Sequence, residues 1–63
     1  MSGPRNEGLE AAALWHDKQA RIYALDTEAL SASNAAEARI DKYVALANEH
    51  RASAAIFRGM MSA

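Results

Sequence analysis

Hydrophobic residues along this chain recur at steps of three and four, and no stretch alternates hydrophobic and polar residues with a period of two. Steps of three and four are the pattern of an amphipathic helix. Pro4 is the only proline, and no glycine occurs between Gly8 and Gly59, so nothing from Leu9 to Arg58 strongly breaks a helix. The sequence therefore predicts an all-α protein.

One segment interrupts the helical pattern, because two serines and an asparagine cluster at positions 31–34. Asn34 followed by Glu37 has the spacing of a capping box, which predicts that a second helix starts at Asn34. Gly59 directly follows Arg58 and suits the left-handed residue that ends many helices. We therefore predict a single domain over 1–63, an antiparallel two-helix hairpin with helices at about 7–31 and 35–58 and a turn at about 31–34.

A single continuous helix is the alternative to the hairpin. One line of positions seven residues apart runs the length of the chain: Trp15, Ile22, Ala29, Ala36, Tyr43, His50 and Phe57. The companion line of a coiled coil contains Lys18, Arg39 and Ser53, where apolar residues are needed. The hairpin is therefore the preferred prediction.

The predicted second helix has one apolar face, with Asp41 and Glu49 on its other side. The face comprises Ile40, Tyr43, Ala47, His50, Ala54, Phe57 and Met61. We assign the large members Ile40, Tyr43 and Phe57 to the core.

The predicted first helix has two apolar lines on nearly opposite sides. One contains Ala11, Leu14, Trp15, Ile22, Leu25 and Ala29, and we assign Trp15, Ile22 and Leu25 to the core. The other includes Leu9, His16, Tyr23, Thr27 and Leu30, a mixture typical of surfaces that bind partners. A hairpin gives this helix only one neighbour, so we expect the second line to bind another copy of the chain or another protein. The predicted assembly is a four-helix bundle dimer or a larger helical oligomer.

The composition also favours association. Of the 63 residues, 16 are alanine, so few bulky apolar side chains remain to form a core. A chain of this length buries only about 60% of its unfolded surface even when well folded. We therefore expect the chain to need partners for stability.

Candidate catalytic and metal-binding chemistry is sparse. None of Ser31, Ser33 and Ser53 has a histidine that is in turn spaced from an acid so as to complete a catalytic relay, and no glycine-rich phosphate loop is present. His16 and His50 each follow an alanine three positions earlier, where a di-metal bundle site needs glutamate. We predict no catalytic residue, no cofactor and no metal, although the two histidines could meet across a symmetric dimer.

Three arginines, Arg39, Arg51 and Arg58, border the apolar face of the second helix and form a candidate phosphate-binding set. In length and expected hairpin-dimer plan, the chain resembles the small RNA-binding repressor-of-primer proteins of plasmids. That resemblance covers architecture and no residue motif. The alternative prediction is therefore a small nucleic-acid or nucleotide binder that uses these arginines on the assembled bundle, against which the net charge of −1 argues.

The sequence shows no apolar stretch long enough for a membrane span and no hydrophobic region of a signal peptide. The polar side of the second helix is also not rich in lysine, as that of a membrane-surface helix is. We expect a cytoplasmic, non-enzymatic protein that self-associates and binds another protein as a regulator, inhibitor or adaptor. Its size and alanine content are typical of small helical proteins from phages and mobile elements.

Overall fold

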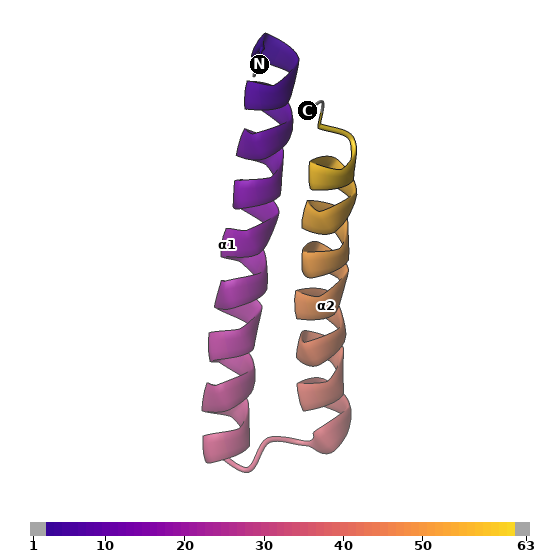
Figure 1. Ribbon diagram of the computed structural model, residues 1–63. Helices are drawn as coiled ribbons and strands as arrows, with labels where there is room; N and C mark the ends of the chain where they lie inside the picture. Colours follow the sequence, from indigo (N-terminus) through magenta and orange to yellow (C-terminus); the bar gives the residue numbers. More distant parts are fainter. Residues whose placement is uncertain (1–2, 62–63) are drawn as a thin grey trace.

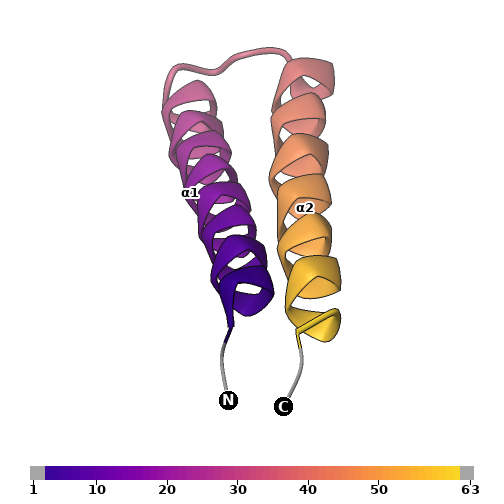
Figure 2. The ribbon, with the colours of Figure 1, turned by 90° about the horizontal axis from the view of Figure 1, so that it is seen from above.

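The computed structural model describes residues 3–61 and contains two antiparallel α-helices joined by a short turn (Figure 1). The first helix, α1, spans Pro4–Ala32, and the second, α2, spans Glu37–Gly59. The helices lie side by side in both views, with the start of α1 near the end of α2 (Figure 2). The predicted helical hairpin is confirmed, and the single continuous helix is wrong.

The hairpin is a thin rod. Its principal extents are 48 × 13 × 11 Å, and its radius of gyration is 14.6 Å. A compact domain of the same length has a radius of gyration of about 11 Å. A rod of two helices has a single contact line between them, so each helix exposes most of its circumference.

α1 begins earlier than the sequence pattern predicts, at Pro4. Proline suits the first position of a helix, since its fixed φ angle is helical and the missing N–H has no partner there in any case. The backbone N–H of Glu7 donates to the carbonyl of Gly3 at 2.9 Å, which closes the first turn. The carboxylate of Glu7 in this turn also interacts favourably with the positive end of the helix dipole.

The turn is built around Asn34, which adopts a left-handed conformation with φ of 58°. The N–H of Asn34 donates to the carbonyl of Ser31 at 3.2 Å, and the N–H of Ala35 donates to that of Leu30 at 3.0 Å. These two bonds are the pattern of a Schellman motif, with Asn34 in the position that glycine most often occupies. Asn34 therefore ends α1.

The capping box predicted for Asn34 and Glu37 is not formed. The residue that precedes α2 is Ala36, and no side chain caps the start of this helix. The prediction is wrong because the left-handed backbone of Asn34 belongs to the end of α1, three residues before α2 begins. The left-handed conformation predicted for Gly59 is also wrong, since no glycine among residues 3–61 has a positive φ and Gly59 is the last residue of α2.

The core consists of alanines. Ala13 and Ala20 of α1 and Ala47 and Ala54 of α2 are at most 2% exposed, and no large side chain in the described chain is fully buried. The two alanines of each helix are seven residues apart, so they lie on the same side of that helix. Such small residues let the two helix backbones approach closely.

Larger half-buried side chains occupy the rest of the contact line. The predicted apolar face of α2 lies against α1, and its members other than the two core alanines are half-buried: Ile40, Tyr43, His50, Phe57 and Met61. Ile40, Tyr43 and Phe57, which the sequence assigns to the core, therefore lie at the helix contact without complete burial.

Candidate interaction surface

One side of α1 carries four large apolar side chains that are exposed. Leu14, Trp15, Ile22 and Leu25 are 55%, 54%, 45% and 55% exposed. We define the outward face of α1 as these four residues together with Ala11, Lys18 and Ala29. Six of its members follow steps of four and three along the helix: Ala11, Trp15, Lys18, Ile22, Leu25 and Ala29. This spacing is that of the contact line between two helices in a coiled coil.

The assignment of Trp15, Ile22 and Leu25 to the core is wrong for the single chain. The two sides of α1 are reversed relative to the prediction. The physical reason lies in the fit between the helices, because close approach requires small residues at the same levels on both of them. Ala13 and Ala20 supply those residues on one side of α1, so the bulkier side faces outward.

The residues predicted to bind a partner lie at the contact between the two helices instead. All five residues of this set are half-buried: Leu9, His16, Tyr23, Thr27 and Leu30. The hydroxyl of Thr27 donates to the backbone carbonyl of Tyr23 at 2.8 Å, so it is satisfied within α1. These residues can therefore contact a partner only through the parts of their side chains that α2 leaves exposed.

Aromatic and histidine rings fill the space between the core alanines. The ring of His16 stacks on that of Phe57, with ring centroids 5.5 Å apart, and the ring of His50 stacks on that of Tyr23 at 5.6 Å. Tyr23 also meets Tyr43 edge to face at 5.7 Å. Between the stacks, the Nδ1 atoms of His16 and His50 lie 2.8 Å apart, within hydrogen-bond distance. The rings fix the register of the hairpin.

Near the open end of the hairpin, Arg58 of α2 contacts two carboxylates of α1. Its Nη2 atom donates to Asp17 Oδ2 at 2.7 Å and lies 3.7 Å from Glu10 Oε1. The hydrogen bond from Arg58 lowers the pKa of Asp17, and the same bond raises the pKa of Arg58. Asp17 and Arg58 are 41 residues apart, so no local spacing in the sequence could have revealed this pair.

The three arginines of the candidate phosphate-binding set do not gather in one place. Arg58 is engaged by carboxylates, and Arg51 donates to Asn48 Oδ1 on its own helix at 3.2 Å. Arg39 lies twelve residues before Arg51, about a third of a turn away around α2. Within the part of the chain that the structure describes, these three arginines therefore form no continuous cationic track.

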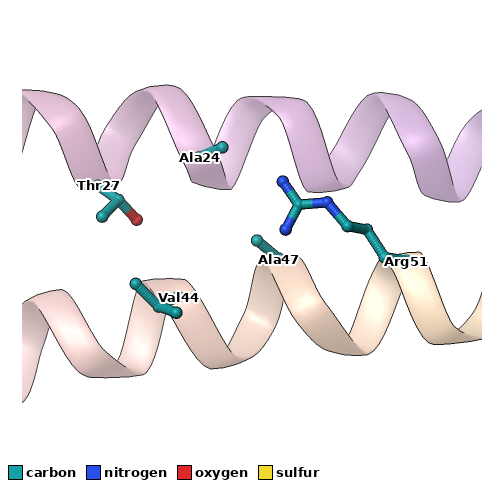
Figure 3. A pocket seen from close by; sticks show the side chains of 5 residues that line it. All are labelled: Ala24, Thr27, Val44, Ala47 and Arg51. Carbon is teal, nitrogen blue, oxygen red and sulfur yellow. The ribbon is translucent and has the colours of Figure 1, made fainter.

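Arg51 also borders a small hollow between the helices. The hollow measures about 120 Å³ and is lined by Ala24, Thr27, Val44, Ala47 and Arg51 (Figure 3). Pockets that hold drug-sized ligands start at about 300 Å³. A second hollow, of about 320 Å³ and open to solvent, lies on the outward face and is lined by Ala11, Leu14, Trp15 and Lys18.

Within residues 3–61, no group of three or more His, Cys, Asp or Glu side chains is placed to hold a metal ion. Over the same range, neither helix combines the length and the apolar character needed to cross a membrane. Comparison with known proteins finds no family model, no curated protein and no solved structure that matches this chain. The outward face of α1 is therefore the feature from which a function is best argued.

Proposed function

We propose that this chain is a cytoplasmic, non-enzymatic helical protein that self-associates through the outward face of α1 and binds another protein as a regulator, inhibitor or adaptor. The observation that carries the proposal is the exposure of Leu14, Trp15, Ile22 and Leu25 on one side of one helix. Monomeric proteins rarely leave large apolar side chains together in water, and such patches usually mark interaction sites.

The total surface supports association. The chain exposes 4508 Å². A folded monomer of 6.8 kDa is expected to expose about 4,000 Å². The excess reflects the thin rod shape, and covering the outward face with a second chain would remove apolar surface from water.

The arrangement of the outward face favours a second copy as its occupant. Steps of four and three place its residues along one line, and the small Ala11 and Ala29 lie at the two ends of that line. In an antiparallel pairing of two α1 helices with Ile22 on the two-fold axis, Lys18 of each copy lies level with Asp26 of the other. The pairing thus combines apolar contact in the middle with opposite charges beside it, and the dimer contains four helices.

Self-association is tested with two matched variants, Ile22→Glu and Ile56→Glu. Both isoleucines are exposed and helical, at 45% and 63%, but Ile22 lies on the outward face and Ile56 on α2. Size-exclusion chromatography with light scattering should show a dimer for the wild type and for Ile56→Glu, and a folded monomer for Ile22→Glu. A dimer for Ile22→Glu would remove the outward face from the proposal.

Binding of another protein is tested by capture from the native cytoplasm with tagged wild type and with Ile22→Glu, each with and without nuclease. The proposal predicts a defined protein that the wild type retains after nuclease treatment and that Ile22→Glu retains poorly. Capture that disappears with nuclease would contradict a protein partner and support the nucleic-acid alternative.

A further inference from the structure

The two histidines of the chain meet at the helix contact. One lies on each helix, and their Nδ1 atoms are 2.8 Å apart. Both side chains are half-buried, and their ring centroids are 5.1 Å apart. Histidine is the side chain that changes charge between about pH 5 and 8.

The number of protons on the pair decides whether the hydrogen bond exists. When both rings are neutral, Nδ1–H of one donates to the lone pair of the other. One added proton keeps this bond, because the charged ring still donates to the neutral ring, and a charge-assisted bond is stronger. Two added protons leave N–H groups facing each other at both Nδ1 atoms, so the bond is lost and two positive charges repel across the contact.

The repulsion that opposes a second positive charge comes from the pair itself, because each histidine lies against an aromatic ring. Phe57 and Tyr23 present ring faces to His16 and His50, and an aromatic face attracts a cation. Asp17 follows His16 in the chain, and its carboxylate accepts from Arg58 and also interacts electrostatically with His16. The charged side chains within two positions of either histidine are Asp17 and Lys18 of α1 and Glu49 and Arg51 of α2, and the titratable ring of Tyr23 stacks on His50.

Trp15 connects this pair to the outward face. Its ring meets His16 edge to face at 4.9 Å and His50 at 5.8 Å. The same side chain is 54% exposed and belongs to the outward face. If the two imidazoles separate, the Trp15 ring therefore cannot keep both of these contacts.

We infer that His16 and His50 form a pH-responsive contact in which the second protonation separates the two rings, displaces Trp15 and weakens association through the outward face. The effect on association rests on the proposed function, whereas the response of the pair and of Trp15 belongs to the single chain.

The protonation steps are tested on the full wild-type chain by NMR of the imidazole nitrogens between about pH 8 and pH 5, the range in which histidine titrates. The two histidines are the only imidazoles, so no other ring contributes. The inference predicts two separate titration steps that both rings report, with Trp15 indole signals moving in the second step. If each ring instead titrates in one step that the other ring does not report, and the Trp15 indole signals do not move, the inference is overturned.

Association is tested by the dimer dissociation constant and Trp15 fluorescence at both ends of this pH range, with the double variant His16→Gln and His50→Gln as the control. The control keeps hydrogen-bonding side chains and removes the titration. The wild-type dimer should weaken by about fivefold or more at the acidic end, a typical size for coupling between sites, while the folded control, checked by circular dichroism, should not change. A wild type that is monomeric at both pH values contradicts the proposed function, whereas a dimer of equal strength with unchanged Trp15 emission contradicts the pH response.

Discussion

Arg58, in the last turn of α2, donates a 2.7 Å hydrogen bond to Asp17 in the middle of α1. The pair joins two segments that are 41 residues apart and lies on the surface of the hairpin. A cation in the last turn of a helix also interacts favourably with the negative end of the helix dipole. Arg58 therefore stabilises both its own helix end and the antiparallel register.

Replacing Arg58 with glutamine should raise the pKa of Asp17 toward its ordinary value of 3.8, because the hydrogen bond from Arg58 is the main cause of its lowered pKa. In the wild type, this bond contributes stability that is fully present above the ordinary pKa and is lost as pH falls through the lowered pKa. NMR titration of the Asp17 carboxyl group measures the change. Arg39→Gln, an exposed arginine on the same helix, should leave the pKa of Asp17 unchanged.

Enlarging a core alanine should separate the helices. Ala47→Leu is expected to lower the free energy of unfolding by about 1–3 kcal/mol, because the added side chain has no space between the helices. Ala45→Leu, at an exposed position of the same helix, should change it by less than about 0.5 kcal/mol. Urea unfolding followed by circular dichroism compares the two. Equal effects would contradict the alanine core.

The left-handed conformation of Asn34 makes a prediction opposite to that of the capping box. Asn34→Gly should preserve or raise the free energy of unfolding, since glycine adopts a positive φ without strain. Asn34→Ala should lower it by about 1–2 kcal/mol, because alanine lacks the short polar side chain whose local hydrogen bonding lets asparagine adopt the left-handed conformation. Thermal unfolding of the three proteins distinguishes the cases. A loss in Asn34→Gly similar to that in Asn34→Ala would instead favour a capping role for the Asn34 side chain.

The antiparallel pairing of two α1 helices predicts a charge-reversal effect. Lys18→Glu and Asp26→Lys should each weaken the dimer by about fivefold, since each change places like charges together twice per dimer. The double variant restores opposite charges and should dimerise like the wild type. Sedimentation velocity over a concentration series measures the three dissociation constants. Additive weakening in the double variant would argue against this register.

The hairpin could be predicted from the sequence because its determinants are local. The middle of the chain contains no proline or glycine, which permits long helices there. Apolar residues at steps of three and four from Ile40 to Met61 mark the side of α2 that contacts α1. The serines and Asn34 show where the chain turns. Whether Asn34 ends one helix or starts the next depends on its φ angle, which the residue type alone does not determine.

The side of α1 that faces α2 could not be predicted from hydrophobicity. Trp15, Ile22 and Leu25 form the more apolar line, yet the line with Ala13 and Ala20 packs against α2. The choice depends on matching small residues across two helices, a relationship between distant positions. The same is true of the His16–His50 contact, which joins residues 34 apart.

The mass of the wild-type chain in solution tests the central claim most directly. Sedimentation equilibrium at micromolar concentration should give twice the chain mass of 6.8 kDa, with Trp15 emission shifted to shorter wavelength as the outward face leaves water. A well-folded particle of 6.8 kDa across this concentration range, with the emission of a water-exposed indole, would contradict the account.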